Sequence, residues 1–185
     1  MTVEITTADH GRVWSSNRLV DTAIGSGVSE QPGLAVEVVQ RSLDGVVRAE
    51  VVVRNAGTQP VRLESVTSLV AGGLAAPDDV DVLWAENDWL AECRWRSEPM
   101  RVTSPDRNGR IRDSRYKGAF IVAGHGVWSS CGRLPMGGLT ERTTGRTWVW
   151  QIEHNGGGWR WECGVQDGAA YVALSGPEEY DHGWS

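Results

Sequence analysis

The stretch that decides the fold lies between residues 34 and 54 and reads LAVEVVQRSLDGVVRAEVVVR. Valine is abundant in both halves, and β-branched side chains pack well on the pleated surface of a sheet. Asp44-Gly45, between the halves, is a strong signal for a two-residue hairpin turn. We therefore predict two antiparallel strands, Leu34–Leu43 and Val46–Arg54. Successive side chains of a strand point to opposite faces, so one face of the second strand carries Val47, Ala49, Val51 and Val53.

Shorter apolar runs extend this β pattern along the chain. Apolar and polar residues alternate over Val80–Trp84 and Trp89–Arg96, and Ala119–Ala123 is a short apolar run. Helical spacing of apolar residues is weak throughout, and 23 glycines indicate frequent turns. The sequence therefore predicts an all-β fold, an antiparallel β-sandwich with at most short helical turns. Within it we expect a half-buried strand at 89–96 and irregular segments at 97–116 and 128–139.

A second hairpin is predicted where two aromatic runs, 146–154 and 159–165, flank Asn155-Gly156-Gly157-Gly158. If Gly156-Gly157 forms the tight turn, Glu153 faces Arg160, and this pairing of opposite charges supports the register. The same register pairs three more residues of the first run with three of the second: His154 with Trp159, Ile152 with Trp161, and Trp150 with Cys163. The strand alternation also predicts four core residues, Trp148, Trp150, Trp159 and Trp161.

Composition and charge exclude several classes of protein. The formal net charge is −6, so we expect neither nucleic-acid binding nor a basic membrane patch. No apolar run approaches the roughly 18 residues of a membrane span. The first ten residues lack the pattern of a signal peptide, so we expect a cytoplasmic protein. The three cysteines, Cys93, Cys131 and Cys163, form no CxxC pair, and we expect free thiols in a reducing compartment.

The sequence has no GxSxG, HExxH, GxGxxG or P-loop motif. Its four histidines show no metal-ligand spacing, and we expect neither a metal nor a cofactor. A glycosidase needs two carboxylates on either side of the scissile bond. The carboxylates near aromatic residues are Glu86, Asp88, Glu92, Glu153 and Glu162. Glu92 and Glu153 alternate with apolar residues, which favours solvated strand faces over catalytic positions.

Tryptophan is the positive signal, with ten Trp against one Phe and three Tyr. An indole can stack on a sugar ring while its N–H finds a partner, but indoles also fill cores. At Trp89 the two interpretations are about level. In the first, Asp88 accepts a sugar hydroxyl and Trp89 is the platform beneath the ring. In the second, Asn87 and Asp88 satisfy local backbone N–H groups in a turn, and Trp89 packs inward.

Five motifs follow one another in a fixed order along the chain: LWAENDWLAECRWR (83–96), HGVWSS (125–130), LPMG (134–137), WQIEHNGGGWRWE (150–162), and LSGP (174–177) with DHGW (181–184). Together they resemble the N-terminal β-sandwich domain of glycoside hydrolase family 36, the α-galactosidases and melibiases. The resemblance extends over residues 34–184. Cys93 and Cys131 stand where it leads us to expect glycine.

In this family a supersandwich of the galactose mutarotase type precedes a (β/α)8 barrel, which carries both catalytic Asp residues of a retaining α-galactosidase. The resemblance implies that residues 1–185 form a single non-catalytic β-sandwich domain, the N-terminal part of a larger glycoside hydrolase and inactive alone. In the family the sandwich usually continues for several more strands after the position that corresponds to Ser185. The resemblance therefore implies that this chain is truncated or is a short stand-alone relative. The implied partners are the catalytic barrel, α-galactoside oligosaccharides and further copies in a homo-oligomer.

Loops of the family's sandwich can close the sugar pocket, sometimes that of a neighbouring subunit. The resemblance makes Asp88 and Trp89 the first candidates for substrate binding, with Arg94 and Trp95 second. It assigns no catalytic and no metal-binding residue to this chain. Two other functions stay open: a stand-alone carbohydrate-binding module, and a β-sandwich enzyme that uses two of its own Glu residues. The gene sequence downstream of Ser185 distinguishes the module from the hydrolase domain.

Overall fold

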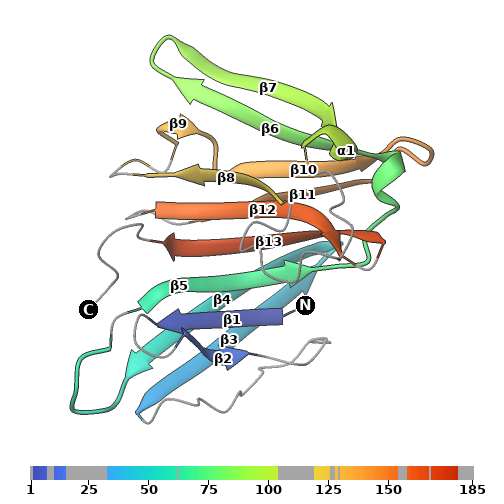
Figure 1. Ribbon diagram of the computed structural model, residues 1–185. Helices are drawn as coiled ribbons and strands as arrows, with labels where there is room; N and C mark the ends of the chain where they lie inside the picture. The colour runs from blue at the N-terminus through green and yellow to red at the C-terminus, as the bar shows by residue number, and fades with distance from the viewer. Residues whose placement is uncertain are drawn as a thin grey trace.

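A computed structural model of the chain describes residues 2–7, 11–15, 33–61, 63–103, 119–125, 128, 130–153, 158–166 and 168–178. In these residues 13 strands pair antiparallel in three sheets (Figure 1). The described helical segments are the short η1 (Pro77–Asp79) and α1 (Met100–Thr103). The predicted all-β, antiparallel fold is confirmed. No helix in the described ranges has the length and apolar character needed to cross a membrane.

Two of the sheets form the sandwich. The larger has the order β2-β1-β5-β13-β12-β8, with bounds Gly11–Ser15, Thr2–Thr7, Leu63–Ala71, Ala169–Glu178, Gly158–Gln166 and Phe120–Gly124. The second has the order β11-β10-β6-β7, with bounds Thr147–Gln151, Met136–Glu141, Val80–Asp88 and Ala91–Pro99, and β9 (Gly132–Arg133) pairs with β6. In this sheet β7 is therefore an edge strand.

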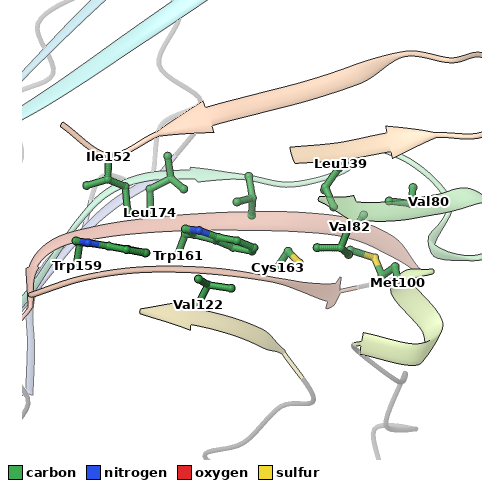
Figure 2. Packing of buried hydrophobic residues seen from close by; sticks show 12 residues of the cluster. Val80, Val82, Met100, Val122, Leu139, Ile152, Trp159, Trp161, Cys163 and Leu174 are labelled. Carbon is green, nitrogen blue, oxygen red and sulfur yellow. The ribbon is translucent and has the colours of Figure 1, made fainter. Parts of the chain in front are cut away.

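The main core lies between these two sheets. Trp159 and Trp161 of β12 stand at its centre and are 1% and 0% exposed (Figure 2). Aromatic contacts join the sheets: Trp161 lies 5.2 Å from Trp150 of β11 between ring centroids, and Phe120 of β8 lies 5.8 Å from Trp84 of β6. Burial of such large rings makes a large apolar contribution to the stability of a fold.

The predicted N-terminal hairpin is confirmed. β3 (Leu34–Leu43) and β4 (Val46–Asn55) pair in register around Asp44-Gly45, with Leu43 opposite Val46. The hairpin has its own small core, where Leu34 and Val38 pack with Val66 of β5. This two-stranded sheet therefore adds to the sandwich as a separate layer beside β5 (Figure 1).

The predicted second hairpin is wrong. β11 pairs with β10, whereas β12 pairs with β13 and β8, so the two runs belong to different sheets. Glu153 forms an ion pair with Arg48 of β4 (3.0 Å). His154 and residues 155–157 of the predicted turn lie outside the described residues. The predicted inward side chains are nevertheless correct, since all of them form the core or pack against it: Trp148, Trp150, Ile152, Trp159, Trp161 and Cys163.

Glycine opposite tryptophan explains the pairing that the structure has instead. Gly137 of β10 lies opposite Trp150, and a Cβ there would come within 2.8 Å of the indole. Gly124 of β8 lies opposite Trp159, where a Cβ would come within 2.4 Å. Each indole therefore lies over bare backbone of the next strand, a known way of pinning the register of a sheet. This fit between strands outweighs the glycine-rich turn signal.

Two other sequence predictions need correction. Residues 128–139, expected to be irregular, contain β9 and the first part of β10, because Gly137 and Gly138 serve close packing rather than a turn. Residues 89–96, expected to be half-buried, are largely exposed because β7 is an edge strand, and Trp95 is 51% exposed. Of the segment 97–116, the end of β7 and α1 are ordered elements, and residues 104–116 lie outside the described part.

Candidate functional site

The hairpin of β6 and β7 carries the predicted site residues. β6 continues beyond the alternating run Val80–Trp84 through Glu86-Asn87-Asp88, and Trp89-Leu90 forms the turn. The turn lies at the upper edge of the molecule in Figure 1, with β9 at the same end. Trp89 and Leu90 are 82% and 84% exposed. Trp89 therefore does not pack inward.

Asp88 has a local role in this turn. Its Oδ1 accepts a hydrogen bond from the backbone N–H of Trp89 at 2.7 Å. The carboxylate is exposed and adjacent to the exposed indole. The structure thus agrees in part with each interpretation of Trp89 given above. Asp88 binds a local backbone N–H, as in the turn interpretation, and Trp89 points outward, as in the sugar-platform interpretation.

Glu86 is the centre of a positively charged cluster. Its carboxylate lies 3.0 Å from Arg96, 3.2 Å from Arg133 and 3.6 Å from Arg94. The hydrogen bond from Arg96, the charges of Arg96 and Arg94 and the hydrogen bond from Arg133 together lower the pKa of Glu86. Glu86 is therefore held ionised as a counter-ion and is unsuited to proton transfer near neutral pH.

The same arginines cover the end of the aromatic core. The guanidinium groups of Arg133 and Arg96 lie 4.9 Å and 5.4 Å from the ring centroid of Trp84. Trp84 in turn contacts Phe120 of the opposite sheet. These cation–π contacts make the Glu86 cluster part of the structural support of the hairpin.

The four predicted binding residues do not converge on one point. Asp88 and Trp89 are neighbours in the turn. Arg94 faces Glu86 across the strands, whereas Trp95 is opposite Ala85 and projects from the other face of β7. Only Asp88 and Trp89 are thus placed together at an exposed tip.

Asn87 links this hairpin to a second turn. Its Oδ1 accepts the backbone N–H of Cys93 at 3.1 Å, and its Nδ2 donates to the carbonyl oxygen of Ser130 at 2.7 Å. The backbone N–H of Cys131 donates to the carbonyl oxygen of Trp128 at 3.1 Å, which closes the second turn. Trp128 is 73% exposed.

Sequence reasoning did not single out Trp128, and it gave Asn87 only the role of satisfying backbone N–H groups of the turn, which its bond from Cys93 agrees with. The available signal for Trp128 was its position in a polar, glycine-rich stretch, HGVWSSCG, where a core tryptophan is unexpected. The hydrogen bond from Asn87 to Ser130 had no sequence signal, because the two residues are 43 positions apart. Only the pairing of β9 with β6 brings the two together.

The other reactive groups to consider in the described ranges are three cysteines, of which one is buried and two are exposed. Cys163 is buried, and burial together with the nearby charge of Glu162 raises its pKa to about 12. Cys93 and Cys131 are exposed free thiols. Within the described residues no three His, Cys, Asp or Glu side chains are grouped to hold a metal ion. A hollow between Arg41 and Arg48 holds about 10 Å³, room for roughly one water molecule.

The architecture and the site together define an antiparallel β-sandwich with an aromatic, solvent-exposed hairpin tip. No family model and no curated protein matches the sequence. Two of the solved structures that share the fold are α-galactosidases. One is the galactosidase domain of the α-galactosidase–sucrose kinase AgaSK, with a TM-score of 0.61 and 13% identity. The other is a substituted α-galactosidase AgaA of glycoside hydrolase family 36 from Geobacillus stearothermophilus in complex with raffinose, with a TM-score of 0.57 and 15% identity.

Each similarity covers 93% of this chain but only 26% of the solved chain. The chain thus corresponds to about a quarter of either α-galactosidase. At this level of identity the similarity shows a shared fold, which agrees with the resemblance found in the sequence motifs.

Proposed function

We propose that this chain is the non-catalytic β-sandwich of an α-galactosidase-like glycoside hydrolase. The β6–β7 turn reaches the sugar pocket of the full-length protein, its own or that of a neighbouring copy. The observation that carries this proposal is the exposed Trp89 beside Asp88, at a turn of a fold shared with two α-galactosidases. Such a pair suits a sugar, because an indole packs under the C–H face of the ring and a carboxylate accepts hydroxyl hydrogen bonds.

The hydrolytic step is assigned to a different domain of the full-length protein. Retaining hydrolysis requires a nucleophilic carboxylate and an acid/base carboxylate about 5–5.5 Å apart. Glu86 is neutralised by arginines, and Glu153 is bound to Arg48. Glu162 accepts a hydrogen bond from Tyr171 at 3.2 Å. These environments suit structural roles, and the 185-residue chain is expected to be inactive on α-galactosides.

The partners follow from the same proposal. They are a catalytic barrel domain, a terminal α-galactoside, and further copies of the chain where a neighbour's pocket is closed. A cytoplasmic location is part of the proposal, supported by two exposed free thiols, Cys93 and Cys131, which suit a reducing compartment.

The test is kinetic and uses the full-length gene product with a terminal α-galactoside. Trp89→Ala and Asp88→Ala should each lower kcat/KM by an amount equivalent to about 1–3 kcal/mol, with little change in Tm. Leu43→Ala is the matched control, because Leu43 is 74% exposed at the tip of the other hairpin. Unchanged kcat/KM in both site variants would show that the turn is structural. Hydrolysis by the 185-residue chain alone would overturn the non-catalytic assignment.

A further inference from the structure

Two exposed tryptophans sit on turns that are fastened to each other through one side chain. Trp89 lies in the β6–β7 turn, and Trp128 begins the turn that leads into β9. Asn87 immediately precedes Asp88 and Trp89, and its amide donates to the carbonyl oxygen of Ser130. Other links between the two segments are the short pairing of β9 with β6 at Glu86–Arg133 and Asn87–Gly132 and the ion pair between Arg133 and Glu86, and neither involves the turn residues from Trp128 to Cys131.

We propose that Trp128 is a further substrate contact that stacks on a sugar beyond the terminal galactose, and that Asn87 is the positioning residue that fixes Trp128 relative to Trp89. This inference rests on the proposed function and deepens it. It names the substrate class as α-galactosides that extend beyond one sugar unit. One indole covers one pyranose ring, so an oligosaccharide gains from a second platform held at a fixed distance.

The exposure of the two indoles favours this role over core filling. Trp89 and Trp128 are 82% and 73% exposed, whereas Trp159 and Trp161 are almost fully buried. Exposed aromatic side chains gathered on linked turns are typical of binding surfaces rather than of a structural surface.

Asn55 shows what an asparagine of purely local function does in this fold. Its Oδ1 accepts the N–H of Gly57 at 3.0 Å and its Nδ2 donates to the carbonyl oxygen of Gln59 at 2.8 Å. Asn55 and Asn87 thus make the same two kinds of hydrogen bond. Both partners of Asn55 lie within its own turn, and residues 55–61 contain no aromatic side chain. Asn87 instead joins segments that are 43 residues apart.

Asn87 is bonded to a part of the hairpin whose backbone has an unfavourable conformation. Leu90 and Cys93 have φ values of 59° and 52°, in the left-handed region that favours glycine. Asn87 accepts the N–H of Cys93 and so helps to fix this conformation. Constraint of this kind is found where side chains are pre-organised for a ligand.

The experiment measures KM and kcat of the full-length gene product on two substrates, the trisaccharide raffinose and a p-nitrophenyl α-galactoside that has a single sugar. Trp128→Ala should raise KM for raffinose about 5- to 30-fold, the factor that corresponds to loss of one stacking contact of about 1–2 kcal/mol. KM for the nitrophenyl substrate and kcat on both substrates should stay nearly constant. Trp128 is exposed, so Trp128→Ala should fold normally.

The positioning role is tested with Asn87→Asp, which keeps the acceptor for Cys93 N–H but removes the donor to Ser130. It should raise KM for raffinose, and it should add nothing in the Trp128→Ala background, because both changes remove the same contact. The matched control is Asn55→Asp, which should leave KM on both substrates unchanged. If Asn87→Asp folds poorly, Asn87→Ser is used in its place, since the serine side chain is shorter but its hydroxyl oxygen can still accept a hydrogen bond.

A second readout does not depend on catalysis. In protein labelled with 5-fluorotryptophan, the ¹⁹F resonance of Trp128 should shift or broaden in Asn87→Asp and remain unchanged in Asn55→Asp. An unaltered resonance would overturn the positioning role, as would an effect of Asn87→Asp on KM that persists in the Trp128→Ala background.

The remaining outcomes separate this inference from the proposed function. If Trp89→Ala raises KM but Trp128→Ala leaves it unchanged on raffinose, only the inference is overturned. If Trp128→Ala affects both substrates equally, its assignment to a sugar beyond the terminal galactose is wrong. If none of the variants at Asp88, Trp89, Asn87 and Trp128 changes KM or kcat, the proposed function and the inference are both overturned.

Discussion

Cys93 adopts a backbone conformation that suits glycine. Its φ of 52° lies in the left-handed region, which costs an L-residue with a Cβ about 1–2 kcal/mol. The sequence motifs led us to expect glycine at this position, and the conformation agrees with that expectation. Cys93→Gly should therefore increase the free energy of unfolding by about 0.5–1 kcal/mol, after subtracting the greater entropy of the unfolded glycine chain.

Urea unfolding of Cys93→Gly and Cys131→Gly measures this effect. Cys131 is also exposed but has no left-handed φ, so its replacement should be neutral or destabilising. A lower free energy of unfolding for Cys93→Gly would mean that its side chain contributes more than its conformation costs.

Glu86 should make the hairpin sensitive to acid. The hydrogen bond from Arg96 and the neighbouring arginine charges lower its pKa below the ordinary 4.5 in the folded state. At pH values between the pKa of folded Glu86 and the ordinary pKa, the folded chain therefore binds fewer protons than the unfolded chain. The stabilisation by Glu86 is complete above the ordinary pKa and is lost as the pH falls through the lower pKa of the folded chain. Glu86→Gln should lower Tm at pH 7 and lower it much less at pH 3.

The control for this pH effect is Glu37→Gln, because Glu37 is exposed on β3, far along the chain from the arginine cluster. It should change Tm little at either pH. An equal loss of Tm at both pH values in Glu86→Gln would indicate that packing, not charge, is what Glu86 contributes.

At the scale of the elements, contacts between strands decide the pairing more than the turns do. The Asp44-Gly45 turn correctly predicted the β3–β4 hairpin, since β3 ends directly before it, β4 begins directly after it, and the two strands have the same length. The glycine-rich segment after Ile152 suggested an equally tight hairpin, but the chain crosses to the other sheet there. In β11 and β12, alternation correctly predicted which side chains point inward, because that property is local. It could not predict the neighbouring strands, because nothing local marks Gly137 as the residue opposite Trp150 or Gly124 as the residue opposite Trp159.

The contact between Gly137 and Trp150 can be tested directly. A Cβ at Gly137 would lie 2.8 Å from the indole, so Gly137→Ala must displace a ring that packs against Trp161. We expect a loss of about 1–3 kcal/mol in the free energy of unfolding, the usual cost of overpacking. Gly72→Ala is the matched control, because its nearest contact would be an ordinary 3.9 Å from Tyr171. If both variants unfold at the same denaturant concentration, β10 and β11 are not pinned by this contact.

At the scale of the whole molecule, the sequence was sufficient for the fold class and for the position of the candidate tip. Period-2 alternation and frequent glycine predict an antiparallel β-sandwich whatever the strand order. Exposure of the tip was harder to predict, because Trp89 and Trp95 alternate as core residues do. Trp89 is exposed because it lies in the β6–β7 turn, and Trp95 is exposed because β7 is an edge strand, a property of the complete sheet. The link from Asn87 to Ser130 likewise depends on the position of β9.

The central claim is that this sandwich presents Trp89 to the sugar pocket of an α-galactosidase-like enzyme. The most direct measurement is a crystal structure of the full-length gene product with a terminal α-galactoside bound. We predict that the Trp89 indole, from the same chain or from a neighbouring copy, lies within van der Waals contact of a sugar ring, about 4 Å. A pocket closed entirely by other segments, with Trp89 in solvent in every copy, would contradict the claim.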